Sequence, residues 1–148
     1  MTEIKDLISY QVHMVANLLS RGAELRYRRE FGVSLWEWRT IALLGATDEP
    51  QSLGHLARAA GIDKSQMSRV VSGLTRRKLV MRDTNDEDGR GVHLRLSKSG
   101  RKLYGGLIGA AAQRDAALRA RLIARKKDGK HVFDIRLRGE GETPFFDD

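Results

Sequence analysis

Residues 63–76 constrain the fold of this chain most, because their polar and apolar members separate onto two faces of one helix. Along one face, three or four residues apart, lie Ser65, Arg69, Ser72 and Arg76. The interleaved positions hold Met67, Val70, Val71 and Leu74. At about 100° per residue these two sets point to opposite sides of a helix. One face therefore suits a protein core, and the other suits hydrogen bonding to polyanions and to base edges.

Two signals make this segment the second helix of a helix-turn-helix. Asp63 and Gln66, three residues apart, form a capping-box pattern that predicts where the helix begins. Gly61 stands just before it and ends a shorter predicted helix, residues 52–60, which Ser52 caps. A second helix that carries Ser, Gln and Arg outward is the groove-reading arrangement of many DNA-binding proteins.

Long apolar stripes flank this motif on both sides. Helical spacing of apolar residues runs from Ile4 to Leu25, which is far longer than an average globular helix. From Ser97 to about Arg125 a second stripe consists of Leu103, Leu107, Ala111, Leu118 and Leu122. Two such stripes imply a partner subunit, so we expect a homodimer whose dimerisation region covers about residues 4–30 and 98–137.

The segments between the stripes complete the predicted architecture. Ser34 and Glu37 form a second capping box, which opens a helix through Leu44. Alternating apolar residues predict strands at 79–84 and 92–96, and the polar segment between them makes a hairpin wing. The expected fold class is mainly α: a winged helix-turn-helix with long N- and C-terminal dimerisation helices and a two-stranded β wing.

The C-terminal part gives a weaker signal than the rest. We expect one domain over residues 1–148, with its winged core at about 34–98 and a flexible Gly- and Pro-containing tail at 139–148. Phe133, Ile135 and Leu137 alternate like a strand, yet Val132, Phe133 and Leu137 suit a short helix equally well. The sequence leaves these two alternatives open, and in either case Phe133 and Leu137 are expected to pack on the first helix of a subunit.

Composition removes several classes of function. The chain has no cysteine, which excludes disulfides, thiolate nucleophiles, thiol redox sensing and Cys-based zinc sites. Its four histidines lack metal-ligand spacing, and no phosphate-binding loop or nucleophile elbow occurs, so neither a cofactor nor an enzyme activity is expected. No run of about 20 apolar residues and no signal-peptide pattern is present, which predicts a cytoplasmic protein without membrane contact.

The net charge of +8 is concentrated in the middle of the chain and beyond it. Residues 52–98 carry ten Lys and Arg against five Asp and Glu, and residues 99–138 carry eleven against three. Residues 139–148 carry four acids and no base. A basic domain with a polar helix face suits a phosphate backbone, although charge alone also fits a merely soluble cationic protein.

The order long helix, short helix, helix-turn-helix, wing, long helix resembles the MarR (multiple antibiotic resistance regulator) family of bacterial winged-helix transcription factors. Within residues 56–100 the likeness rests on the polar face of the second helix and on three short motifs of the wing. A Leu-Val-x-Arg motif begins the wing, an Asp-x-Arg motif with Asp88 and Arg90 forms its tip, and a Leu-Ser-x-x-Gly motif that ends at Gly100 follows its second strand. The resemblance implies a homodimeric regulator of transcription, a repressor rather than an activator, that binds double-stranded DNA. Members usually close with two interlocking helices, whereas residues 126–148 here are short and Gly-rich.

Two sets of candidate site residues follow. DNA contacts are expected from Arg to guanine edges, from Gln to adenine, from Ser to phosphates or bases, and from the wing tip to the minor groove. The residues are Ser52, His55, Lys64, Ser65, Gln66, Ser68, Arg69, Ser72, Arg76 and Arg90. The resemblance also implies a possible small aromatic or anionic effector, bound near His13, Met14, Trp38 and Arg39.

Each expectation has a plainer alternative. The polar helix face could be an ordinary solvated surface, and Trp38 shares a face with Leu35 and Ile41, as a core residue would. Arg90 could form only a turn salt bridge. For the whole chain the alternative is a winged-helix protein-interaction module without DNA-binding activity.

Overall fold

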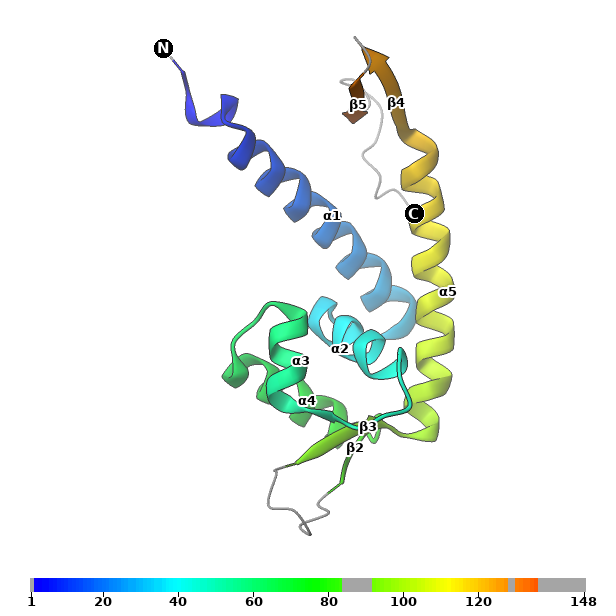
Figure 1. Ribbon diagram of the computed structural model, residues 1–148. Helices are drawn as coiled ribbons and strands as arrows, with labels where there is room; N and C mark the ends of the chain where they lie inside the picture. Colours follow the sequence, from blue (N-terminus) through cyan, green and yellow to red (C-terminus); the bar gives the residue numbers. More distant parts are fainter. Residues whose placement is uncertain (1, 84–91, 128–129, 136–148) are drawn as a thin grey trace. The chain divides into compact units, whose positions relative to one another are not determined.

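The computed structural model describes residues 2–83, 92–127 and 130–135, with side chains as far as residue 120 (Figure 1). Two compact units, residues 1–107 and 108–148, make up the chain, and the division between them falls within one helix, α5. In chain order the elements are η1 (Ile4–Asp6), α1 (Ile8–Phe31), α2 (Leu35–Gly45), β1 (Gln51–Ser52), α3 (Leu53–Ala60), α4 (Lys64–Arg76), β2 (Val80–Asp83), β3 (His93–Leu96), α5 (Lys98–Arg121), β4 (Leu122–Lys127) and β5 (Lys130–Ile135).

The long first helix is present, with corrected ends. Leu7 is extended, with φ −73° and ψ 130°, so the predicted start at Ile4 is a separate 3-10 turn and α1 begins at Ile8. The helix ends at Gly32, whose φ of 65° lies in the left-handed region that glycine adopts without steric cost. In Figure 1 the N-terminal half of α1, in blue, extends away from α2, α3 and α4.

The core of the first unit lies where α2, α3, α4 and the sheet meet. The predicted capping box opens α2, because Ser34 Oγ accepts from the Glu37 amide at 3.2 Å and Glu37 Oε2 accepts from the Ser34 amide at 2.8 Å. The fully buried large residues include Ile41, Leu44, Leu56, Met67, Leu74, Leu94 and Leu107. Thr40, also buried, donates its hydroxyl to the Trp36 carbonyl at 2.8 Å, so the core holds no unsatisfied side-chain polar atom among the described residues.

The predicted two-stranded wing is present as β2 and β3, and it belongs to a sheet of three strands in the order β1-β3-β2, because the short β1 joins it. Gln51 pairs with Leu94 and Ser52 with His93, which adds β1 to the outer edge of β3. A strand of two residues is too short to show alternation, and this is why the sequence did not predict it. Val80–Asp83 and His93–Leu96 confirm the other two strands with shorter bounds, whereas Thr84 and the tip at 85–91 lie outside the described residues.

The exit motif of the wing has a direct structural reason. Ser97 Oγ accepts from the Gly100 amide at 3.0 Å and donates to the Lys78 carbonyl at 2.7 Å, so this one side chain caps α5 and ties it to the start of the wing. A Cβ on Gly100 would lie 2.1 Å from the Leu79 carbonyl oxygen. Leu-Ser-x-x-Gly is therefore a capping and close-packing signal.

The second unit contains the end of α5 and a β hairpin. The helix stops at Arg121, so the predicted continuation to about Arg125 is wrong, and β4 begins at Leu122 instead. β4 and β5 are antiparallel, with a register that runs from Leu122 opposite Ile135 to Lys127 opposite Lys130. The strand alternative is thus the correct one for Phe133 and Ile135, while Leu137 and the predicted tail at 139–148 lie outside the described residues.

Candidate nucleic-acid interface

The core fixes which face of α4 is turned outward. Met67, Val71 and Leu74 are completely buried, and Val70 is half-buried, as the helical pattern predicts. On the opposite side, the polar face of α4 consists of Lys64, Ser65, Ser68, Arg69, Ser72 and Arg76, all exposed or half-buried. Because the buried positions set the rotation of the helix, this face has to point away from the core.

The start of α4 differs in one detail from its prediction. Asp63 Oδ1 accepts from the Gln66 amide at 2.8 Å, which is the expected N-cap. Of the predicted capping box only this half is present, since the Asp63 amide donates no return bond to the Gln66 side chain. Within the described part of the chain the Gln66 carboxamide has no hydrogen-bond partner, so both its donor and its acceptor groups can bind a ligand.

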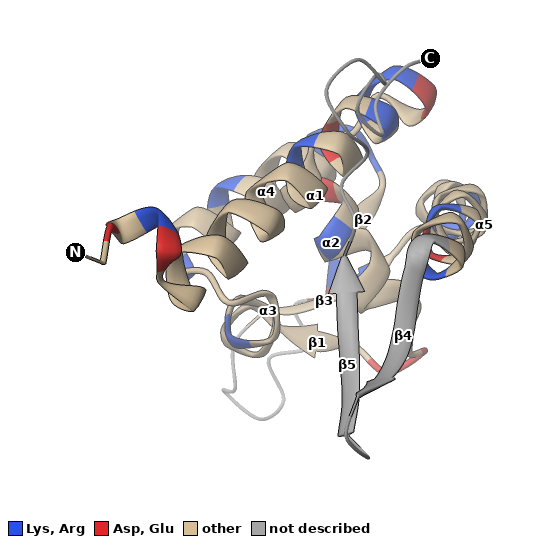
Figure 2. Cartoon of the chain, turned by 90° about the horizontal axis from the view of Figure 1, so that it is seen from above, with Lys and Arg blue, Asp and Glu red and all other residues tan. Residues whose placement is uncertain are grey.

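Within the described residues, two arginines of the polar face lack the acidic partner that several other arginines of this unit have. Arg77 is paired with Glu37 at 3.2 Å, Arg95 with Asp83 at 2.9 Å, and Arg101 with Asp48 at 2.6 Å. Arg69 and Arg76, by contrast, have no carboxylate partner in residues 2–83 and 92–120. Lys and Arg, blue in Figure 2, also occur on α3 and α5. Positive charge without an internal partner is what a phosphate backbone would neutralise.

The start of α3 holds the other two predicted residues of the helix-turn-helix. Ser52 Oγ accepts from the His55 amide at 3.2 Å, so its oxygen caps the helix as predicted. His55 is exposed one turn into α3. The first amides of a helix can hold a phosphate, and both residues lie beside them.

The wing is described at its base but not at its tip. Arg90 and its neighbour Asp88 lie outside the described residues. At the base, Arg82 Nη2 donates to Ser72 Oγ of α4 at 3.2 Å, a contact that the sequence analysis missed. Alternation indicates only that Arg82, two residues after Val80, lies on the same side of β2 as Val80, and it does not identify Ser72 as the partner.

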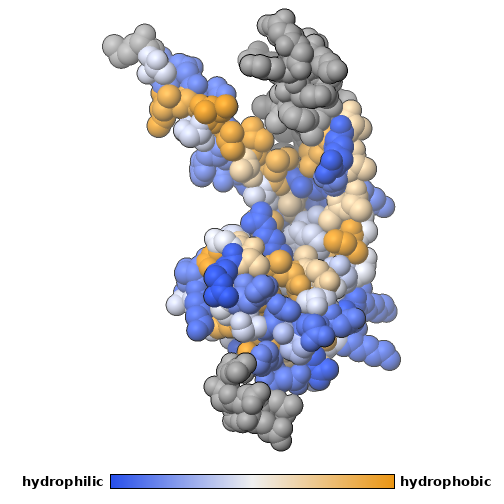
Figure 3. Space-filling view, in the orientation of Figure 1, coloured by the Kyte–Doolittle hydropathy of each residue, from blue (hydrophilic) through white to orange (hydrophobic). Residues whose placement is uncertain are grey.

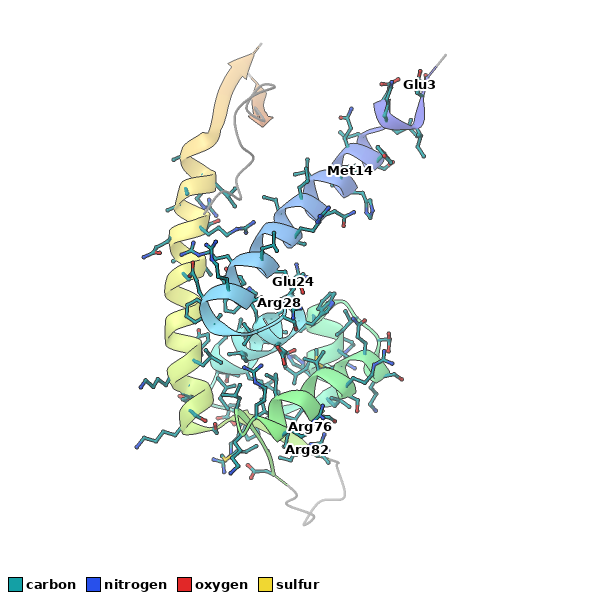
Figure 4. All side chains as sticks on the ribbon, turned by 180° about the vertical axis from the view of Figure 1, so that it is seen from behind. Glu3, Met14, Glu24, Arg28, Arg76 and Arg82 are labelled. Atoms are coloured by element: carbon teal, nitrogen blue, oxygen red, sulfur yellow. The ribbon has the colours of Figure 1, made fainter. Side chains whose placement is uncertain are left out.

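The four predicted effector residues are only partly brought together. The half-buried Trp38 packs on Tyr27, with ring centroids 5.0 Å apart, and Arg39 lies 4.9 Å from the Trp36 ring and 3.5 Å from Ser20 Oγ of α1. His13 instead contacts Asn17 at 2.9 Å. Figure 4 shows Met14 on the part of α1 that extends away from α2, and its side chain is 42% exposed.

Other kinds of site find no support in the described ranges. No group of three or more His, Cys, Asp and Glu there could hold a metal ion. No helix among these residues is long and apolar enough to cross a membrane.

Comparison with known proteins agrees with this geometry. Residues 31–91 match a family profile described as "MarR family". A MarR/EmrR family transcriptional regulator from Acinetobacter sp. ADP1 is 28% identical, with a TM-score of 0.72 over 79% of this chain and 82% of that one. No curated protein matches the sequence.

Two further solved structures carry ligands in their names. The S. aureus MepR-DNA complex is 20% identical, with a TM-score of 0.71 over 82% of this chain and 86% of that one. CouR from Rhodococcus jostii RHA1, bound to p-coumaroyl-CoA, is 19% identical, with a TM-score of 0.68 over 76% of this chain and 78% of that one. At these identities the likeness shows a shared fold.

Proposed function

We propose that this chain, whose residues 31–91 match the MarR family profile, is a DNA-binding transcriptional regulator of that type and not an enzyme. In this proposal it is a sequence-specific repressor that binds an inverted-repeat operator as a homodimer. Each subunit places α4 in a major groove and Arg90 at the flanking minor groove or phosphate. Repression needs no contact beyond the operator, because a dimer bound across a promoter excludes the polymerase from it.

One observation carries the proposal. The polar face of α4 presents Arg69 and Arg76 without carboxylate partners in the described ranges, on a helix whose rotation is fixed by completely buried Met67, Val71 and Leu74. A guanidinium that is rigidly presented and unpaired can form the bidentate bond to guanine that gives sequence specificity.

The apolar surface of α1 supports the homodimer. Ile8 and Val12 are 79% and 62% exposed and lie four residues apart on α1, and Ile4, in the preceding turn η1, is 67% exposed. Figure 3 shows hydrophobic residues, in orange, along the N-terminal half of α1, whereas the lobe with α3 and α4 is mostly hydrophilic. A stripe of this kind is typical of an interface. Two-fold symmetry would set the two α4 helices about one DNA turn apart.

The test of DNA reading begins with selection of bound duplexes from a random library. We expect the recovered site to be an inverted repeat with half-site centres about one turn apart, and binding to weaken steeply as salt rises. Arg69→Ala should cost about 1–3 kcal/mol and blur preference at one base pair. The control is Arg28→Ala on α1. It removes the same charge as Arg69→Ala, but from an arginine that is paired with Glu24 and lies outside the proposed interface, so DNA affinity should not change.

The results separate the two functions that the sequence left open. Wild-type affinity in Arg69→Ala would contradict the proposed orientation of α4. Failure of the unmodified protein to select any duplex would favour the protein-interaction module instead. If a selected site is placed over a reporter promoter, expression should fall when the protein is present, and a rise would contradict repression.

The test of assembly uses the same site. Ile8→Glu with Val12→Glu should give a folded monomer in light scattering at micromolar concentration and should abolish tight binding to the inverted repeat. The control is Gln11→Glu, which adds one acid to the same part of α1. A wild-type monomer that still binds the repeat tightly would refute the proposed dimer.

An effector site is the last part of the proposal. Arg39 offers a cation beside the ring of Trp36, and the residue before it in the chain is Trp38, an arrangement that suits a small aromatic anion. Because these are the two tryptophans of the chain, their fluorescence reports on this region. Binding of benzoate should quench the tryptophan fluorescence and release the protein from the selected duplex. Arg39→Gln should weaken both the quenching and the release. Quenching without release would contradict an effector role.

A further inference from the structure

The bond between Arg82 and Ser72 joins the base of the wing to the polar face of α4. Arg82 Nη2 donates to Ser72 Oγ at 3.2 Å. Ser72 was predicted to touch phosphate or base directly. In the structure its hydroxyl oxygen accepts a hydrogen bond from Arg82 of β2.

The position of Arg82 in the sheet explains how it reaches α4. It pairs with Leu94 in the register of β2 and β3, and Val80 pairs with Leu96. Residues opposite each other share a face, and on this face Val80, Leu94 and Leu96 are buried. Arg82 is therefore the exposed residue on the side of the wing that faces the core. It lies at the edge of the core, next to the polar face of α4.

The charge of Arg82 is not compensated within the described ranges. Asp83, the next residue, pairs with Arg95 at 2.9 Å. Arg82 has no carboxylate partner in residues 2–83 and 92–120, and its guanidinium has five N–H donors, of which Ser72 receives one. Most of its hydrogen-bonding capacity is thus left for a ligand.

Arg82 also has cationic neighbours. Arg69 precedes Ser72 by three residues and Arg76 follows it by four, so both are adjacent to Ser72 on the surface of α4. Figure 4 shows Arg76 and Arg82 at the C-terminal end of α4, next to the base of the wing. Ser72 therefore contacts one arginine and has two more as neighbours on the helix surface, an arrangement that favours a bound phosphate.

We propose that Arg82 binds a backbone phosphate of the DNA, and that Ser72 is a positioning residue that orients the Arg82 guanidinium and does not read a base. The proposal rests on the proposed DNA-binding function. A phosphate held between α4 and the wing would fix the depth at which α4 enters the major groove, because one arginine is anchored to both elements.

The experiment measures affinity for the selected duplex at several salt concentrations, with the full-length protein. Arg82→Ala should weaken binding roughly tenfold and lower the salt slope by about one unit. Arg82→Lys should keep the slope, because the charge remains. The control is Arg95→Ala, which removes a wing arginine already paired with Asp83 and should leave the slope unchanged.

A double-mutant cycle then tests the role of Ser72. Ser72→Ala alone should weaken binding roughly threefold with an unchanged salt slope and unchanged base preference, and it should have no further effect in the Arg82→Ala background. Thermal unfolding of each variant shows that it is folded.

Two results would overturn the proposal. An Arg82→Ala variant that is folded and keeps the wild-type slope would make Arg82 a strut between β2 and α4. Equal effects of Ser72→Ala in both backgrounds, or a shifted base preference, would return Ser72 to base reading. If the unmodified protein binds no duplex, the proposed function fails first, and that result is distinct from either of these.

Discussion

Gly100 gives the sharpest test of how the wing is attached to α5. A Cβ at this position would lie 2.1 Å from the Leu79 carbonyl oxygen, 3.1 Å from its carbon and 3.3 Å from Leu96 Cδ2. The first two contacts are with backbone, so no side chain can turn away to relieve them. Gly100→Ala should therefore push the first turn of α5 away from the start of β2.

The expected change in the free energy of unfolding of Gly100→Ala is the balance of two opposing effects. Alanine is favoured over glycine in a helix by about 1 kcal/mol. To restore an ordinary contact with the Leu79 oxygen the helix has to move by roughly 1 Å, and overpacking of this kind costs about 1–3 kcal/mol or more. The shift also threatens the Ser97 bonds to Gly100 and Lys78, each worth about 1 kcal/mol. We expect a net loss of about 2 kcal/mol, or about 4–8 °C in Tm.

Gly105 is the matched control, because a Cβ there meets nothing within 4 Å on the same helix. Gly105→Ala should raise stability by about 0.4–1 kcal/mol. Thermal and urea unfolding of both variants measure the two effects. If Gly100→Ala is as stable as Gly105→Ala, the close approach of α5 to Leu79 does not exist as described.

Three further predictions rest on single features. Lys78 has a φ of 58°, so Lys78→Gly should stabilise the protein by about 1 kcal/mol in urea unfolding, and no gain would mean that this backbone carries no strain. Arg90→Ala should weaken DNA binding and lower the salt slope by about one unit, whereas an unchanged slope and affinity would make Arg90 a turn residue only. Since the chain has no cysteine, low peroxide should not release it from DNA, and rapid release that a reductant reverses would contradict this.

The sequence predicted the elements whose signals are local. The predicted N-cap bonds of Ser34, Ser52 and Asp63 are present, because a cap depends only on residues within one turn. The rotation of α4 was equally predictable, since its apolar residues bury one fixed stripe. Together with the wing and its exit motif, these signals were enough to predict the fold class, which the likeness to solved structures confirms, and the resemblance to the MarR family, whose profile matches residues 31–91.

Contacts that depend on register between distant segments could not be predicted in the same way. β1 has two residues, so nothing in Gln51 and Ser52 reveals that they pair with Leu94 and His93 some forty positions later. The Arg82 bond to Ser72 requires the rotation of α4 and the pairing of β2 to be known together. Each was predictable alone, but only their combination brings a wing residue to the middle of the polar face of α4. The proposed DNA interface combines α4 with β2, so the helix pattern predicts its residues on α4, and the sheet register is needed to propose that one of them, Ser72, acts through Arg82.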